Sequence, residues 1–267
     1  KYFKTDYAAI LNLNVDHLER HGTINRYAQA KIKLICDQNK NQISIIEKNN
    51  YIINKNILNK KIKSKIIKIK FDKMSFFKKK IKNYYLLDKN NLNNIHFVYK
   101  ISKIFKISDH IIFKTLNLFK GLKFRKQIVL SKKNLKIIND SKSTSFSSSI
   151  NLLENINSIF WIVGGLPKKG DKLKLKNKKN ISKIYICGRH SSFFTKNFRN
   201  KFKYSKFNKL NQAVKQFSLD IKKEDKNKKI NLIFSPCAAS FDNFKNFEER
   251  GKYFNFLVKR YKLKYAS

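Results

Sequence analysis

Residues 230–251 read INLIFSPCAASFDNFKNFEERG, and this stretch decides how the second half of the chain is interpreted. It begins with a short apolar run typical of a buried strand and continues into a loop of small and polar residues. Two other apolar runs, at 136–138 and 159–163, lead into similar loops, which read NDSKSTS (139–145) and GGLPKKGD (164–171). In an open α/β sheet, ligands bind where loops leave the carboxyl ends of strands. The three loops therefore predict one site for an anionic substrate.

Around these loops, strand-like and helix-like segments alternate from residue 122 onward. This alternation predicts βαβ units and a mainly parallel sheet. The expected strands are Gln127–Leu130, Lys136–Asn139, Ser158–Val163, Lys183–Cys187 and Asn231–Phe234. The expected helices are Ser147–Asn155, Ser191–Asn200, Leu210–Asp220 and Phe241–Tyr261, and Lys168–Asn180 is expected to be a solvated loop.

The first part of the chain is less regular, and Gly121 separates it from the second. We expect a buried strand at 7–13, a loop at 14–23, and a helix at Ile24–Ile35 with Thr23 as its N-cap. The remaining elements expected here are strands at Gln42–Ile46, Lys65–Lys70 and Tyr84–Leu87, and helices at 91–107 and 109–119. The whole chain is thus predicted to be an α/β protein.

The formal net charge is +44, from 61 Lys and Arg against 17 Asp and Glu. A charge of this size points to nucleic acid or to an anionic membrane surface. However, only seven of these residues are Arg, the Lys are spread along the chain, and Asn and Ile are abundant. A nucleic-acid binder clusters its basic residues and favours Arg for bidentate contacts. We therefore attribute the charge to AT-rich codon usage and expect no specific nucleic-acid partner, with a basic nucleic-acid-binding protein kept as the alternative from another class.

The cysteines and the hydropathy bound the environment of the protein. Cys36, Cys187 and Cys237 are far apart, which argues against a disulfide framework or a zinc site and fits a reducing cytoplasm. No apolar run reaches about 18 residues, so no membrane span is expected. The sequence starts without Met and lacks the apolar core of a signal peptide, so we expect a fragment of a longer protein.

Together with two motifs near the N-terminus, the three loops resemble those of the Mur ligase family, and within it of the members that add D-glutamate. Residues 13–22 (LNVDHLERHG) resemble the family's DHLDRHG stretch, and residues 27–31 (YAQAK) its YxxAK motif. Cys237 and Ala238 stand in exchanged order relative to the family's SPACAS phrase. The match runs from about residue 8 to 260 and is weakest between 40 and 90. Several motifs in the right order are far more specific than any one alone.

The resemblance implies that residues 1–121 are the C-terminal part of a central ATP-binding domain and that 122–267 are a Rossmann-like domain with a mainly parallel sheet. It implies ATP-dependent amide-bond formation through an acyl phosphate, which adds D-glutamate to UDP-N-acetylmuramoyl-L-alanine in peptidoglycan synthesis. ATP and Mg²⁺ are the implied cofactors, and a cytoplasmic monomer is expected. The family's glycine-rich phosphate loop and UDP-substrate domain lie upstream of these motifs, so the chain alone is expected to be inactive. Another amide ligase of the same superfamily is the nearest alternative.

The resemblance also implies roles for individual residues. By itself, a loop His or a Lys on a Lys-rich helix is usually solvated; the motif context makes His17 and Lys31, the latter as a carbamate, the catalytic magnesium ligands. The implied ATP-binding residues are Asn94, Arg125, Asp140 and Lys142. The register around Asn94 is open by one residue because Asn is so common there, and Arg125 is otherwise a surface residue.

The implied D-glutamate ligands are Thr144 and Lys168 for the α-carboxylate, and Ser240 and the backbone N–H of Phe247 for the side-chain carboxylate. Ser240 is expected to cap or precede the final helix, whose N-terminus favours an anion. The alternative for Ser240 is an N-cap without a ligand. The side chain of Phe247 is expected to lie in the core.

Overall fold

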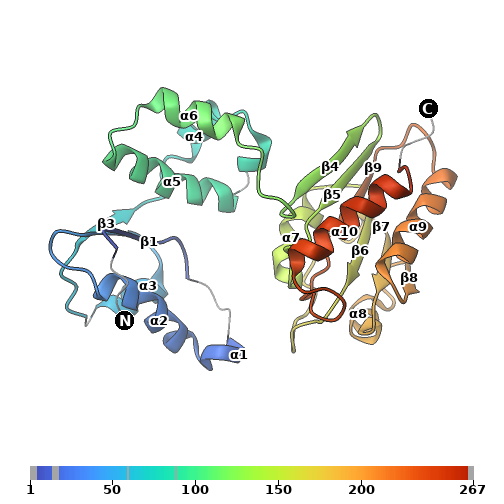
Figure 1. The fold of residues 1–267 in the computed structure, drawn as a ribbon, viewed down its shortest axis with the longest axis horizontal. Coiled ribbons are helices and arrows are strands. Elements are labelled where there is room, and N and C mark those ends of the chain that lie inside the picture. Colours follow the sequence, from blue (N-terminus) through green and yellow to red (C-terminus); the bar gives the residue numbers. More distant parts are fainter. Residues whose placement is uncertain (1–4, 14–17, 59, 88, 264–267) are drawn as a thin grey trace. The chain divides into compact units, whose positions relative to one another are not determined.

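The computed structural model describes residues 5–13, 18–58, 60–87 and 89–263, and it confirms the α/β fold class. The chain divides into two compact units, Lys1–Lys120 and Gly121–Ser267 (Figure 1). Each unit has its own sheet and its own hydrophobic clusters. None of the helices among the described residues is both long and apolar enough to cross a membrane.

The first unit is built on a parallel three-stranded sheet in the order β1-β2-β3 (β1 Tyr7–Ile10, β2 Ile43–Glu47, β3 Lys65–Ile69). Helices α2 (Ile24–Cys36) and α3 (Tyr51–Ile57) bury their apolar residues against one face of this sheet. The predicted N-cap of α2 is confirmed, because the Thr23 hydroxyl accepts the backbone N–H of Arg26 at 3.2 Å. A short helix, α1 (Leu18–His21), occupies part of the segment predicted as a loop.

Helix α5 (Lys89–Ile104) covers the other face, where Phe97 packs with Ile45 and Ile69. Helices α4 (Met74–Lys80) and α6 (Asp109–Leu118) and the 3₁₀ turn η1 (Tyr84–Leu86) surround a cluster that includes Phe77 and Phe113.

The strand predicted at Tyr84–Leu87 is wrong, because this segment forms η1. The Asn83 side chain accepts the backbone N–H of Tyr85 and donates to the carbonyls of Leu116 and Phe119. Such a side-chain turn competes with an extended backbone. Helices α3 and α4 were also not predicted.

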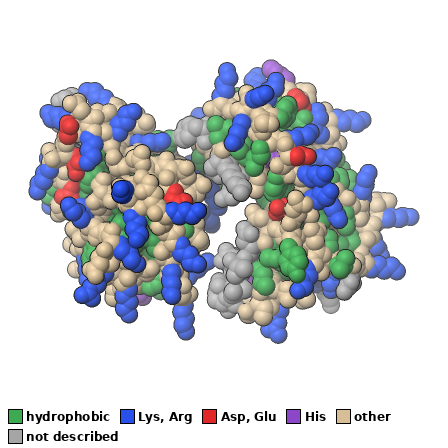
Figure 2. All heavy atoms as spheres, turned by 180° about the vertical axis from the view of Figure 1, so that it is seen from behind, with side chains coloured by type: hydrophobic (Ala, Val, Ile, Leu, Met, Phe, Trp, Pro, Cys, Tyr) green, Lys and Arg blue, Asp and Glu red, His purple; other side chains and the backbone are tan. Residues whose placement is uncertain are grey.

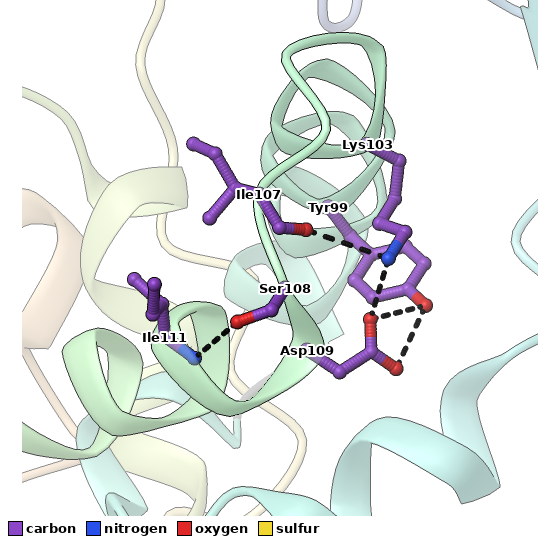
Figure 3. Close-up of polar contacts among 6 residues, drawn as sticks. All are labelled: Tyr99, Lys103, Ile107, Ser108, Asp109 and Ile111. Atoms are coloured by element: carbon purple, nitrogen blue, oxygen red, sulfur yellow. Dashed lines mark hydrogen bonds and ion pairs between the residues drawn. The ribbon is translucent and has the colours of Figure 1, made fainter.

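Polar contacts hold the corner between the consecutive helices α5 and α6 (Figure 3). Lys103 Nζ and the Tyr99 hydroxyl both lie within 3.1 Å of Asp109 Oδ1. The hydrogen bond from Lys103 is the largest influence that lowers the pKa of the Asp109 carboxyl. Ser108 caps α6 by accepting the N–H of Ile111.

The second unit contains a six-stranded sheet in the order β4-β5-β9-β6-β7-β8. All neighbouring strands are parallel except the edge pair β4 and β5, which is antiparallel. The bounds are β4 Gln127–Lys132, β5 Leu135–Asn139, β6 Ile159–Gly164, β7 Ile181–Cys187, β8 Tyr204–Phe207 and β9 Ile230–Phe234. The expected mainly parallel sheet is confirmed; β8, a four-residue edge strand without a buried residue, was not predicted.

Helices cover both faces of this sheet and give the unit three layers (Figure 1). On one face, α7 (Phe146–Glu154) and α8 (Ser191–Phe198) pack around Trp161. On the other face, α9 (Leu210–Asp220) and α10 (Phe247–Arg260) pack around residues such as Phe234, with the short η2 (Ile221–Lys223) following α9.

Two expectations for the loops of this unit need correction. Helix α10 begins six residues later than predicted, because Asn246 caps it by accepting the N–H of Glu249 at 2.8 Å. The loop Lys168–Asn180 is only partly solvated, because Leu175 and Asn180 are buried.

Lys and Arg side chains are distributed over both units on the face that Figure 2 displays. This agrees with their spread along the sequence.

Candidate functional site

The strands β5, β9 and β6 bring the three predicted loops to the same edge of the sheet. They are parallel neighbours, and in their registers Asn139 and Ile162 both lie opposite Phe234. The segments that begin at Asp140, Gly165 and Ser235 therefore leave the sheet side by side. This is the position at which open α/β sheets bind ligands.

Asp140 directly follows β5 at this edge and is only 4% exposed. Its Oδ1 accepts the backbone N–H of Lys126 at 3.1 Å, and its Oδ2 accepts the hydroxyl of Ser235 at 2.9 Å. Its own N–H donates to the carbonyl of Phe234 at 2.7 Å. Both carboxylate oxygens are thus engaged within the protein, and each retains one lone pair for a further donor.

Burial raises the pKa of Asp140 to about 6, although the hydrogen bonds from Ser235 and Lys126 and the nearby Arg125 act in the opposite direction. The desolvation of the charged form outweighs these contacts. Perturbed carboxyl groups of this kind concentrate at functional sites, which makes Asp140 the best candidate of the edge on electrostatic grounds.

Arg250 on α10 braces the loops that follow β5 and β9. Its Nη2 donates to the carbonyls of Ser141 (2.8 Å) and Ala238 (3.0 Å), and its Nε donates to the Ser141 hydroxyl (3.1 Å). The Ser141 hydroxyl in turn donates to the carbonyl of Phe247, the first residue of α10. The N-terminus of α10 is therefore fixed against the Asp140 loop.

Gly164 and Gly165 let the end of β6 approach its neighbours closely. A Cβ at Gly164 would lie 1.9 Å from the carbonyl oxygen of Cys187, and one at Gly165 would lie 2.4 Å from that of Ala239. Both glycines also adopt positive φ angles, which other residues rarely tolerate. The adjacent Leu166 forms a two-way backbone bridge with Ala239 (2.9 and 2.8 Å). The loops carrying Lys168 and Ser240 are joined through this bridge.

Asp171 joins the same β6 loop to the start of α7. Its Oδ2 accepts the backbone N–H of Phe146 at 2.8 Å and so caps this helix from outside its own segment. Burial raises the pKa of Asp171, and the positive charge of Lys168 opposes this increase. Because Thr144 lies two residues before Phe146, the structure ties its loop to that of Lys168 and thereby to that of Ser240.

The predicted residues of the second unit differ in exposure. Ser240 is buried, Thr144, Lys168 and Phe247 are half-buried, and Lys142 and Arg125 are exposed. The Nζ of Lys142 lies 3.9 Å from the centroid of the Phe247 ring, a cation–π contact that places two predicted site residues together. The Phe247 side chain is therefore only partly in the core, contrary to the expectation.

In the first unit, the predicted site residues lie on different elements. Lys31 is exposed on α2, with its Nζ 4.9 Å from the centroid of the Tyr27 ring. Asn94 is half-buried on α5, on the other side of the sheet from α2. His17 lies outside the described residues. Beside Asn94, the Oδ1 of Asn93 is buried and has no hydrogen-bond partner among the described residues.

A metal site is not formed by the described residues themselves: none of their His, Cys, Asp and Glu side chains gather in a group of three or more that could hold a metal ion. Lys31 as an ammonium has no lone pair, and only its carbamate would supply an oxygen ligand. Its exposed amine is accessible for this modification.

Sequence reasoning missed two residues that organise the site, Arg250 and Asp171. Asp171 is the last residue of the GGLPKKGD stretch, and its distance of 25 residues from Phe146 gives no local signal. Arg250 is one of only seven Arg in a Lys-rich chain, but this signal does not separate it from an exposed residue such as Arg125.

Residues 1–111 match the family model described as the Mur ligase middle domain. Two curated relatives extend the match into the second unit. The chain is 29% identical over 279 residues to UDP-N-acetylmuramoylalanine--D-glutamate ligase of Rickettsia felis. This match covers 98% of this chain and 62% of the relative. It is 31% identical over 269 residues to the ligase of the same name from Wolbachia sp. subsp. Brugia malayi, with 94% and 53% covered. The first unit therefore matches a Mur ligase domain, and the chain spans less than two thirds of the length of these relatives.

Solved structures show the same fold at low sequence identity. MurF from Acinetobacter baumannii has a TM-score of 0.69 at 14% identity, covering 96% of this chain and 60% of that one. MurF ligase from Thermotoga maritima in complex with ADP has a TM-score of 0.61 at 16% identity, covering 96% and 63%. FolC of E. coli in complex with DHPP and ADP has a TM-score of 0.60 at 12% identity, covering 96% and 62%. These likenesses support the fold alone.

Proposed function

We propose that this chain is part of an ATP-dependent ligase that adds D-glutamate to UDP-N-acetylmuramoyl-L-alanine in peptidoglycan synthesis. The observation that carries the proposal is the convergence of the three loops after β5, β6 and β9, in a chain whose named curated relatives are D-glutamate ligases. The first unit would be the C-terminal part of the central ATP-binding domain, and the second the Rossmann-like C-terminal domain of a cytoplasmic, monomeric enzyme.

The proposed glutamate pocket lies at the joined loops of the second unit. Lys168 supplies a positive charge and Thr144 a hydroxyl for the α-carboxylate of D-glutamate. Ser240 and the backbone N–H of Phe247 serve the side-chain carboxylate. Phe247 is the first residue of α10, and the positive end of a helix dipole favours an anion there. The Leu166–Ala239 bridge and the Asp171 cap support this assignment because they hold the loops in fixed positions.

The proposed nucleotide contacts are the ones that the resemblance implies. Asn94 would bind adenine, Asp140 the ribose, and Arg125 and Lys142 the phosphates. The free lone pairs of Asp140 support its role, because a ribose hydroxyl can donate to them. The ADP named in the Thermotoga MurF and FolC structures is consistent with a nucleotide-binding family.

In the proposed reaction, a substrate carboxylate oxygen attacks the γ-phosphorus of ATP, and the bond to ADP breaks. The amine of D-glutamate then attacks the acyl carbon, loses a proton and displaces phosphate, which leaves an amide. Mg²⁺, with His17 and the Lys31 carbamate as proposed ligands, would neutralise phosphate charge. The role of the described loops is to position D-glutamate, which lowers the entropic part of the barrier.

Binding of D-glutamate to the 267-residue chain, measured by titration calorimetry, tests the pocket. We expect binding of D-glutamate that is at least tenfold tighter than binding of L-glutamate, and a tenfold or greater loss in Lys168→Met and Ser240→Ala. Lys169→Met is the matched control, because Lys169 is exposed and adjacent to Lys168. Equal binding by Lys168→Met and Lys169→Met would mean that only the overall charge attracts the anion.

A preference for L-glutamate would contradict the D-glutamate assignment and favour another amide ligase of the superfamily. Tight, Lys168-independent binding of single-stranded nucleic acid at physiological salt would favour the basic-binder alternative, since non-specific binding of that kind weakens steeply with salt.

A further inference from the structure

A cavity of about 160 Å³ lies on the α9 and α10 side of the second unit's sheet. None of the residues assigned to D-glutamate or ATP lines it. Its walls are partly apolar, with Phe234, Phe244 and Tyr253 among them, and the strand ends at Gly165 and Gly188 close it on another side. A protein cavity of about 150 Å³ can hold benzene, so this one has room for a ligand of about six heavy atoms.

Arg250 places an unused hydrogen-bond donor at this cavity. Its side chain is only 3% exposed, and its Nη1 has no hydrogen-bond partner among the described residues. A Cβ at Gly165 would lie 2.9 Å from this Nη1, which locates the atom beside a glycine of the cavity wall. Nε and Nη2 are held by Ser141 and Ala238, so Nη1 cannot turn toward another acceptor without breaking these bonds.

The charge of Arg250 is also poorly compensated. All three oxygens that accept from it belong to neutral groups. Burial lowers its pKa to about 10, so the guanidinium still carries its charge at neutral pH. A buried cation without an anionic partner is costly, and a carboxylate at Nη1 would offset that cost.

A second positive feature faces the same space. Asn208, Lys209 and Leu210 line the cavity, and α9 begins at Leu210. The N-terminus of this 11-residue helix therefore points its positive dipole end toward the cavity. Arg250 and the start of α9 come from separate elements, and both favour an anion between them.

Asp242 is the acidic residue of the cavity wall. Its Oδ2 accepts from the Nδ2 of Asn243 at 2.8 Å, and among the described contacts no ion pair joins it to Arg250. It lies close enough to Arg250 to raise the pKa of the guanidinium. Its negative charge would weaken the binding of an anionic ligand without blocking it.

We propose that this cavity is a second binding site, which takes a small organic carboxylate with an apolar body. The carboxylate accepts from Arg250 Nη1 and faces the N-terminus of α9, and the apolar body packs against Phe234, Phe244 and Tyr253. Because Arg250 also braces the loops after β5 and β9, occupation of the cavity stiffens the edge that carries the candidate active site.

Titration calorimetry of the 267-residue chain with isobutyrate tests the proposal. Isobutyramide is the matched probe, since it has nearly the same shape and no charge. We expect isobutyrate to bind at least tenfold more tightly than isobutyramide. Similar affinities for the two probes, or no heat from isobutyrate at about 50 mM, would overturn the proposal.

Two variants locate the site without removing the Arg250 brace. Asp242→Asn removes the opposing charge and should strengthen isobutyrate binding at least threefold. Asn208→Trp places a bulky side chain at the exposed rim and should abolish it, with circular dichroism confirming the fold. Isobutyrate binding unchanged in both variants places the ligand elsewhere and contradicts the proposal.

Competition separates this site from the proposed glutamate pocket. We expect saturating D-glutamate to leave isobutyrate bound. Stoichiometric displacement would make the cavity part of the glutamate pocket and would overturn the idea of a second site. Failure of D-glutamate to bind at all, with isobutyrate still bound, would count only against the proposed function.

Discussion

The two units place their candidate residues in different surroundings. In the second unit, Asp140 and Ser240 are buried at a strand edge, where hydrogen bonds between loops fix their positions. In the first unit, Lys31 is exposed on a helix and contacts the Tyr27 ring. The motif residues of the second unit thus also contribute to folding stability, whereas Lys31 contributes little to it. Substitutions of these residues in the second unit should therefore lower stability. Under the proposed function, a substitution of Lys31 should lower activity and leave stability nearly unchanged.

Gly164→Ala should have the largest effect on stability. A small effect would contradict the contrast between the two units. A Cβ there would meet the Cys187 carbonyl oxygen at 1.9 Å, at a φ of +146°. We expect a loss of more than about 4 kcal/mol in unfolding free energy, measured by urea denaturation. Gly170→Ala is the control, because nothing lies within 4 Å of that Cβ. Its positive φ should cost about 1–2 kcal/mol. Equal losses for both variants would contradict the proposed role of close approach.

The pH dependence of stability should show the buried Asp140. Its pKa rises from 3.8 to about 6 on folding. The folded chain then binds this proton more tightly than the unfolded chain, so this group lowers stability as the pH rises from 4 to above 6. The expected contribution is about 3 kcal/mol. It can be measured by urea denaturation of the parent chain and Asp140→Asn across this range. The difference between the two should change with pH in that direction; a constant difference would contradict the raised pKa.

Asp171→Ala should have a moderate effect, and it tests whether the Asp171 contact links the two loops. Loss of the acceptor for the Phe146 N–H should cost about 1–2 kcal/mol, as for other helix caps. Because the same contact positions the Lys168 loop, D-glutamate binding should weaken as well. Thermal denaturation and calorimetry measure the two effects. Asp171→Asn keeps an acceptor oxygen and should retain most of the stability and most of the D-glutamate binding. If Asp171→Asn is as impaired as Asp171→Ala, the negative charge of Asp171 matters and not its hydrogen bond.

Lys31→Gln should have the smallest effect on folding. Loss of an exposed cation–π contact with Tyr27 should cost no more than about 1 kcal/mol in thermal denaturation. Lys33→Gln, exposed on the same helix, is the control. A loss above about 3 kcal/mol, typical of a buried network, would remove the contrast between the units.

Periodicity was sufficient where the elements are long or fully buried. It predicted the bounds of α9, and it placed β5, β6, β7 and β9 to within about two residues. It failed where side chains override propensity: Asn83 turns the segment at η1, and Asn246 delays the start of α10. The short half-buried strand β8 lacks the apolar pattern that periodicity needs.

The candidate site could be predicted only in part, for a related reason. Adjacent motif letters identify the loops, but the contacts that join them connect distant residues, such as Asp171 to Phe146 and Arg250 to Ser141. Nor does composition distinguish the buried Arg250 from an exposed Arg125. The proposed assignments of Thr144, Lys168, Ser240 and Phe247 stay predictions until a ligand is observed.

The most direct measurement of the central claim is a crystal structure of the 267-residue chain with D-glutamate. We expect one carboxylate of D-glutamate at Lys168 and Thr144, and the other at the Ser240 hydroxyl and the Phe247 N–H. Well-ordered D-glutamate bound away from the loops after β5, β6 and β9, with these four groups facing solvent, would contradict it.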